Sequence, residues 1–158
     1  MPSSEGDLVS STSGGQAAQQ TADTSASAGA ADRLGLTRGM VVQELGWDSD
    51  ADESLRESIM DGIDADMVDG EYGNVVDTVV LWWREDDGDL VDGLVDALTD
   101  LVGGGTIWLL TPRVGRSGAI DPADISEGAP IAGLSQTTTA TVSKEWAATR
   151  LEAPKTVS

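Results

Sequence analysis

Two short stretches of this chain are apolar on both sides of an extended backbone, and they constrain the fold more than any other feature. Val79–Trp83 reads Val-Val-Leu-Trp-Trp, and Thr106–Leu110 reads Thr-Ile-Trp-Leu-Leu. A strand without polar alternation belongs in the middle of a sheet that is covered on both faces. We therefore predict buried strands over residues 75–83 and 106–110, with a shorter one over 40–45.

A helix is predicted between the first two strands. Leu55, Ile59 and Ile63 repeat along one helical face. Asp50, with an acidic residue three positions later, is predicted as the N-cap, and the helix is expected to end near Gly62.

A second helix is predicted before the strand at 106–110. Asp89 can cap its start, and an apolar stripe continues from Leu90 to Val102, where the run Gly103–Gly105 signals the end of the helix. Strand, helix and strand in this order indicate parallel strands joined by right-handed crossovers.

The last third of the chain predicts a helix over residues 121–132 and two β-prone segments, 137–142 and 148–153, that pair antiparallel. Together the elements predict an α/β fold: a Rossmann-like, mostly parallel sheet of four to six strands, with helices on its faces and an antiparallel C-terminal edge.

Composition divides the chain into an arm, a domain and a tail. Residues 1–32 are rich in Ser, Thr, Ala and Gly and have few large apolar side chains, which predicts a disordered arm. Residues 33–155 are expected to form one domain with a single core, and residues 156–158 a short tail.

Negative charge is concentrated in the middle of the chain. Between Glu44 and Asp100 there are nineteen acidic residues and only two basic ones, Arg56 and Arg84, against a total net charge of −19. Such a segment repels nucleic acids and anionic membranes and attracts basic proteins. If these side chains gather on one side of the domain, they could dock a basic protein partner. The docking candidates are Asp92, Asp96, Asp100, Glu85 and Asp86.

The chain has no His and no Cys, which excludes His-based catalytic triads, thiolate nucleophiles and the usual zinc sites. The run Asp48, Asp50, Asp52 starts like a calcium loop, but Glu53 and Ile59 stand where that loop needs Gly and Glu. We therefore expect no metal and no cofactor. Without a signal peptide or an apolar span, the expected location is the cytoplasm.

A ligand crevice is expected where the predicted parallel strands end, because open α/β sheets bind ligands there. Glu44-Leu45-Gly46 resembles the start of a nucleotide or S-adenosylmethionine site, but Trp47 and Asp48 follow where further glycines are needed. The crevice candidates are Trp47, Asp48, Trp83, Arg84, Thr111, Arg113 and Arg116; the arginines could hold an anion, or simply balance nearby carboxylates.

Several sequence motifs resemble those of a family of uncharacterised acidic proteins from high-GC actinobacteria. They are Gly39–Asp48, Val80–Arg84 and Ile107–Pro112, with Trp146 and Arg150-Leu151 downstream, and the resemblance spans residues 33–155. It implies an actinobacterial cytoplasmic protein and no particular reaction. More distantly, the order of elements resembles the C-terminal half of class I methyltransferases without the cofactor glycines, which implies a fold alone.

These features favour a non-catalytic interaction or regulatory protein whose acidic helices dock a basic protein partner. The alternative is a small-molecule binder, or a degenerate methyltransferase-like protein, that uses the strand-end crevice. A mimic of DNA, or an enzyme that uses Glu44 or Asp48 as acid or base, also remains open.

Overall fold

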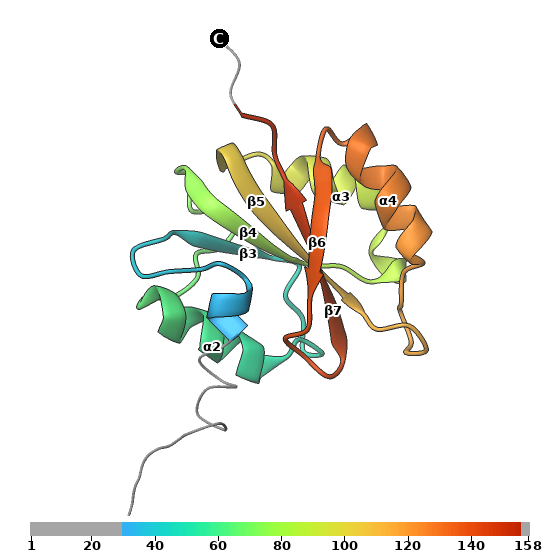
Figure 1. Cartoon of the computed structure of the whole chain (residues 1–158), viewed down its shortest axis with the longest axis horizontal. Coiled ribbons are helices and arrows are strands. Elements are labelled where there is room, and N and C mark those ends of the chain that lie inside the picture. Colours follow the sequence, from blue (N-terminus) through green and yellow to red (C-terminus); the bar gives the residue numbers. More distant parts are fainter. Residues whose placement is uncertain (1–29, 156–158) are drawn as a thin grey trace, which may run out of the picture.

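Five strands form one sheet in the order β3-β4-β5-β7-β6, with helices on both faces (Figure 1). The computed structural model describes residues 30–155. The strands are β3 (Val42–Leu45), β4 (Val76–Trp82), β5 (Leu101–Pro112), β6 (Ser135–Ala140) and β7 (Trp146–Glu152). The helices are α2 (Glu53–Ile63), the 3₁₀ turn η1 (Glu85–Asp87), α3 (Leu90–Ala97) and α4 (Pro122–Ile131).

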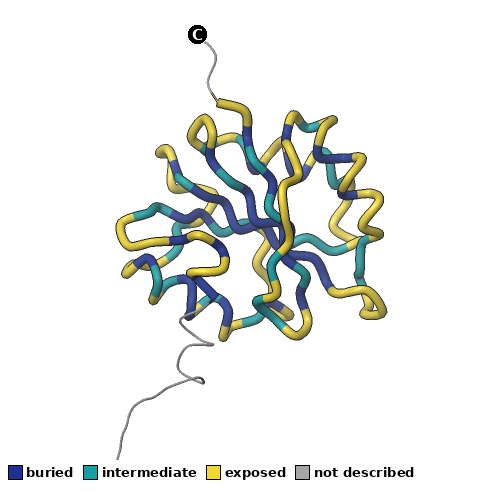
Figure 2. Tube along the Cα trace, in the orientation of Figure 1, coloured by how far each residue is buried: buried dark blue, intermediate teal, exposed yellow. Residues whose placement is uncertain are grey.

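The α/β class and the number of strands are as predicted, but the sheet is mixed rather than mostly parallel. β3 pairs with β4 and β4 with β5 in parallel, whereas β7 pairs antiparallel with both β5 and β6. The antiparallel strand is therefore inside the sheet. The sequence of β7 suits this place because Trp146, Ala148 and Leu151 are buried, while the Ser, Gln and Thr side chains of β6 are exposed at the edge (Figure 2).

Alternate side chains of the central strands fill two cores, one on each face of the sheet. On one face, Val80 and Trp82 of β4 pack with α2. On the other, Val79 and Leu81 pack with α3 and α4. The prediction of a segment buried on both faces is confirmed for Val79–Trp82, whereas Trp83 is only half-buried. Adjacent Trp82 and Trp83 point to opposite faces because side chains alternate along an extended chain.

Two helix boundaries differ from the prediction. The N-cap of α2 is Asp52, whose side chain accepts from the Leu55 backbone N–H, so Asp50 is outside the helix. Helix α3 starts after Asp89 as predicted but ends at Ala97.

The apolar stripe that was expected to extend α3 crosses instead into the next strand. Leu101 and Val102 belong to β5, which also contains the three glycines. Val76 of β4 pairs with Leu101 of β5, and Thr78 pairs with Thr106. An advance of two residues along β4 is thus matched by an advance of five along β5, so β5 bulges at the glycines.

The predicted boundary at residue 32 falls within a short helical segment of the described residues. Residues 30–33 are helical, and Ala30 and Ala31 are buried in the core that contains α2. The rest of the predicted arm and the tail lie outside the described residues.

Candidate functional site at the ends of the parallel strands

The turn after β3 is pressed directly against the end of β4. Gly46 has a φ of 76°, and a Cβ atom added to it would lie 2.2 Å from the backbone oxygen of Trp82. Only glycine fits here, because an L side chain would be strained by this φ and would also meet a backbone atom that cannot move away. The chain from Gly46 onward therefore folds over the strand ends.

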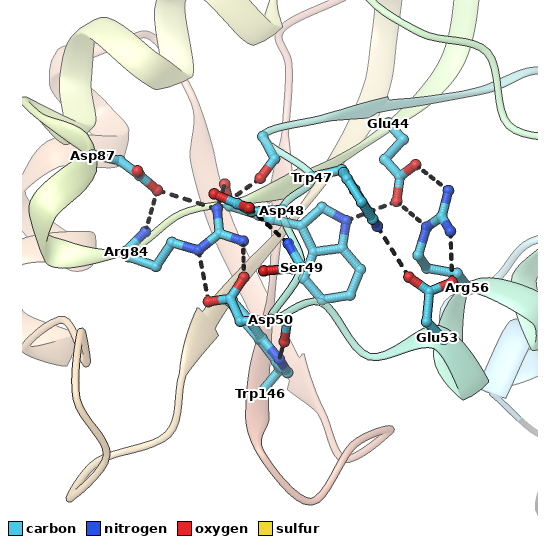
Figure 3. A network of polar contacts seen from close by, with 12 residues as sticks. Glu44, Trp47, Asp48, Ser49, Asp50, Glu53, Arg56, Arg84, Asp87 and Trp146 are labelled. Carbon is cyan, nitrogen blue, oxygen red and sulfur yellow. Dashed lines mark hydrogen bonds and ion pairs between the residues drawn. The ribbon is translucent and has the colours of Figure 1, made fainter.

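Arg84, just after β4, holds this turn in place (Figure 3). Its Nη1 donates to the Gly46 carbonyl oxygen at 2.6 Å and to Asp87 Oδ2 at 3.2 Å. Its Nε and Nη2 donate to the two carboxylate oxygens of Asp50 at 3.1 and 2.5 Å, a bidentate pair. The guanidinium also lies over the Trp146 ring, 5.2 Å from its centroid, and the side chain is only 13% exposed.

These contacts shift the protonation equilibria of both partners. The hydrogen bond from Arg84 is the main cause that lowers the pKa of Asp50 below its usual value of 3.8, against a smaller opposing effect of burial. Burial by itself would lower the pKa of Arg84, but the hydrogen bonds to Asp50 and Asp87 raise it. Asp50 and Arg84 are therefore held as an ion pair at neutral pH.

A second cluster, around Glu44 of β3, adjoins the first. Both Glu44 carboxylate oxygens accept from Arg56 of α2, at 2.6 and 2.8 Å, and one also accepts from Trp82 Nε1 at 2.9 Å. Arg56 Nη1 donates to Glu53 Oε1 at 2.7 Å, and Trp47 Nε1 donates to Glu53 Oε2 at 3.1 Å. The Glu44 side chain is 9% exposed.

Contacts in this second cluster also shift pKa values. The hydrogen bond from Trp47, followed in size by the one from Arg56, lowers the pKa of Glu53. The hydrogen bond to Glu44 raises the pKa of Arg56.

We call the two clusters together the strand-end network: Glu44, Trp47, Asp50, Glu53, Arg56, Arg84, Asp87 and Trp146. Its carboxylates are bound to arginines, so the arrangement ties loops to strands and leaves no carboxylate oxygen of Glu44 facing a ligand. This geometry opposes a role for Glu44 as acid or base.

The predicted crevice residues do not form one site. Trp47 and Arg84 belong to the network, whereas Asp48 is exposed and its carboxylate accepts from the Ser49 N–H at 2.7 Å. Trp83 lies on the other face of the sheet, against α3. Thr111 is buried in β5, and Arg113 and Arg116 are exposed in the following loop, where Arg116 is 3.7 Å from Glu145.

The sequence interpretation missed Glu44, Asp50, Arg56 and Trp146 as members of one network. One signal was present: Arg56 and Arg84 are the only basic residues between Glu44 and Asp100, and both are used here. Isolated cations in such an acidic segment are good candidates for internal pairing, because an arginine offers a bidentate fork to any carboxylate nearby.

The docking candidates are divided as well. Glu85 and Asp86 in η1 and Asp92 and Asp96 on α3 are exposed. Asp100 is not on α3: it is half-buried before β5, and its carboxylate accepts from Gln43 Nε2 at 3.2 Å. Asp92, Asp96 and Asp100 have the four-residue spacing that would place them on one helical face, but Asp100 does not join the other two because α3 stops before it.

The acidic segment does not gather on one side of the domain, as docking by the whole segment would require. Helices α2 and α3 pack against opposite faces of the sheet, so their acidic side chains do not share a surface. Only the η1–α3 surface, which we define as Glu85, Asp86, Asp92 and Asp96, keeps the docking candidates together.

Two hollows flank these features. The strand-end cavity, of about 760 Å³, lies between the start of α2, Arg113 and the β6–β7 turn. The α3–α4 groove, of about 350 Å³, lies on the other face between η1, α3 and α4. Among residues 30–155, no group of three or more acidic side chains is arranged to hold a metal ion. Within the same range, no helix is long and apolar enough to cross a membrane.

Comparison with known proteins confirms the resemblance noted in the sequence. Residues 31–155 match the family described as "Protein of unknown function (DUF3052)". Uncharacterized proteins of Mycobacterium tuberculosis and Mycobacterium bovis are each 43% identical over 123 residues, which cover 78% of this chain and 77% of theirs.

Solved structures with a similar fold are methyltransferases. An O-methyltransferase from neocarzinostatin biosynthesis has a TM-score of 0.58 at 16% identity, over 80% of this chain and 52% of its own. The magnesium protoporphyrin IX methyltransferase of Synechocystis PCC 6803, with bound S-adenosylmethionine, has a TM-score of 0.51 at 12% identity, over 82% of this chain and 78% of its own. At these identities the likeness shows the fold alone.

Proposed function

Because the chain belongs to the family described as "Protein of unknown function (DUF3052)" and shares only its architecture with methyltransferases, we propose a function from its geometry. The protein is a non-catalytic interaction protein whose η1–α3 surface docks a basic protein partner. One observation carries this proposal: Glu85, Asp86, Asp92 and Asp96 are exposed and take part in none of the seven ion pairs found among residues 30–155.

The physical basis is unbalanced charge at close range. Four carboxylates within one 3₁₀ turn and one short helix repel each other, and no described arginine or lysine neutralises them. A cationic partner relieves this repulsion on binding, and the net charge of −19 speeds its approach at low salt. The expected complex therefore weakens as salt is raised.

The test is zero-length carbodiimide crosslinking in a lysate of the source cells, because this reagent joins carboxylates to lysines that touch them. We expect crosslinked partner peptides on the η1–α3 surface at low salt, and a loss of these crosslinks at high salt. A variant with Glu85→Gln, Asp86→Asn, Asp92→Asn and Asp96→Asn should lose the partner.

The matched control removes the same charge from the α2 side: Glu57→Gln, Asp61→Asn, Asp66→Asn and Glu71→Gln. These four residues are exposed. Equal loss of the partner in both variants would mean that net charge alone, not this surface, attracts it.

The strand-end cavity supports a second candidate function, the binding of a small molecule. Its volume of about 760 Å³ is within the usual range of about 300–1,000 Å³ for ligand pockets. Basic side chains of Arg33, Arg113 and Lys144 and acidic ones of Asp52 and Glu145 line it. This mixture of charges suits a zwitterion, such as the S-adenosylmethionine bound by the methyltransferase neighbour.

Trp146 gives a readout for this candidate, since it lies beside Arg113 in an adjoining hollow. Titration with S-adenosylmethionine, nucleotides and acyl-phosphates should quench or shift tryptophan fluorescence, and an Arg113→Gln variant should lose the response. A flat titration with every compound in the panel would remove this candidate.

A further inference from the structure

The α3–α4 groove combines an apolar floor with an acidic rim. Its apolar lining comes from β4, the two helices and the segment before α4: Trp83, Leu90, Val91, Ile120 and Ile131. Four carboxylates stand around this lining: Glu85, Asp89, Asp124 and Glu127. Figure 1 shows the two helices side by side on the face of the sheet opposite α2.

The floor keeps apolar surface in contact with water. Ile131, the last residue of α4, is 73% exposed, and the other four apolar side chains are half-buried. Trp83 forms a firm wall, because its ring packs against the backbone of α3 at Gly93. Covering such a surface is favourable, by about 25 cal/mol per Å² of apolar area removed from water.

The rim sets the charge of whatever covers the floor. No lysine or arginine lines the groove, and none of its four carboxylates forms an ion pair within residues 30–155. Of the four carboxylates, only Asp89 has a hydrogen bond among the described residues: it caps α3 by accepting from the Asp92 backbone N–H. The other three carboxylates are available to cations brought by a partner.

The same charge disfavours two occupants from the protein itself. A second copy carries the same net charge of −19 and would place its own acidic rim against this one. Residues 1–29 contain three acidic residues and no basic one, so they do not complement the rim either. The occupant therefore comes from another protein.

We propose that the α3–α4 groove is the docking site for a short partner segment in which one or two large apolar side chains are flanked by lysine or arginine. The apolar side chains cover Trp83, Val91 and Ile131, and the flanking cations meet Glu85, Asp124 and Glu127. The volume of about 350 Å³ lies at the lower end of the range for ligand pockets and has room for a few side chains. This inference rests on the proposed function, and it adds an apolar anchor to a partner defined so far only by charge.

The experiment uses the full chain, labelled with ¹⁵N, and two synthetic peptides of equal charge. One is Lys-Lys-Leu-Leu-Lys-Lys, and the other is Lys-Lys-Ser-Ser-Lys-Lys, which lacks the apolar anchor. We expect the leucine peptide to bind more tightly at low salt and to shift the amide signals of residues 88–91 and 124–131. The serine peptide should bind weakly and without this localisation.

A variant separates the groove from the charge around it. Ile131→Asn should lower the affinity for the leucine peptide about five-fold, which corresponds to a loss of about 1 kcal/mol of apolar contact. It should leave the affinity for the serine peptide unchanged. Val114→Asn is the matched control, because Val114 is 79% exposed in the loop after β5, outside the groove. It should change neither affinity.

The outcomes distinguish the two proposals. Equal binding of the two peptides, or an Ile131→Asn variant that binds like the wild type, overturns the groove as the docking site and leaves the basic partner standing. Failure of both peptides to bind at low salt, together with no crosslinked partner on the η1–α3 surface, overturns the proposed function itself.

Discussion

The strand-end network and the α3–α4 groove each bring several carboxylates together and use them in opposite ways. In the network, Glu44 and Asp50 are each bound bidentately by an arginine. In the groove, Glu85, Asp124 and Glu127 have no cation among the described residues. The first arrangement stabilises the fold, and the second leaves charge for a partner.

This difference shows that a count of charges along a segment does not locate a binding surface. Arg56 and Arg84, the two basic residues of the segment, neutralise the strand ends, where an α/β fold usually binds its ligand. Negative charge without a cation among the described residues remains on both faces, for example at Glu57 and Asp61 of α2, but on the α3–α4 face it lies beside exposed apolar side chains. The stability of the fold should therefore be sensitive to substitutions in the network and insensitive to substitutions in the groove.

The largest effect is expected at Gly46. Gly46→Ala should lower the free energy of unfolding by about 4 kcal/mol, since it adds a strained positive φ to a clash with the Trp82 backbone oxygen. Gly35→Ala is the control, with a φ of 71° but no atom within 4 Å of the added Cβ, and it should cost about 1 kcal/mol. Urea unfolding measures both, and equal costs would mean that the turn is not pressed against β4.

Next comes Arg84. Arg84→Met should lower the free energy of unfolding by about 3 kcal/mol, because it leaves the Gly46 carbonyl and two carboxylates without their shared donor. Arg116→Met removes an exposed arginine whose ion pair is 3.7 Å long, and it should cost less than about 0.5 kcal/mol. Thermal unfolding followed by circular dichroism would rank the two variants, and the opposite order would contradict the role of Arg84.

A smaller effect should appear as a pH dependence of Asp50. Its pKa in the folded state is below the ordinary value of 3.8, so the ion pair stabilises the fold above that pH and is lost as pH falls through the folded pKa. Asp50→Asn should therefore be less stable than the wild type at pH 6, and the gap should close on acidification below 3.8. A gap that stays constant from pH 6 to pH 2 would show that the charge of Asp50 is not what the pair depends on.

The smallest effect is expected in the groove. Glu85→Gln and Glu127→Gln together should change the free energy of unfolding by less than about 0.5 kcal/mol, because neither carboxylate has a cation to lose. The same double variant should bind the leucine peptide more weakly. A large loss of stability would mean that these side chains serve the fold and are not free for a partner.

Much of the fold could be predicted from local patterns. The doubly apolar segments around Trp82 and Trp108 identify central strands, and the helical repeat of Leu55, Ile59 and Ile63 identifies α2. The insertion of β7 between β5 and β6 could not be predicted, because strand order depends on contacts between distant segments. The end of α3 was misplaced because Leu101 and Val102 continue an apolar stripe on the helical period while belonging to a strand.

The candidate sites were less accessible to sequence reasoning. Trp47 and Arg84 were correctly placed at strand ends. However, Arg84 is bound bidentately by Asp50, and this ion pair forms only because the turn after β3 folds back over the end of β4. The α3–α4 groove combines Trp83 and η1 with α4, which lies beyond the whole of β5 in the chain. No spacing rule connects such positions, so only coordinates bring them together.

The position of β7 has a consequence for the order in which the chain can assemble. β6 leaves the ribosome before β7, yet among residues 30–155 β7 is its only neighbour in the sheet. β6 therefore stays unpaired until β7 has been made, and a nascent chain stalled before Trp146 would hold β5 with one bare flank. Residues 146–152 thus close the sheet, and chains cut short before them would expose two unpaired strand edges to aggregation.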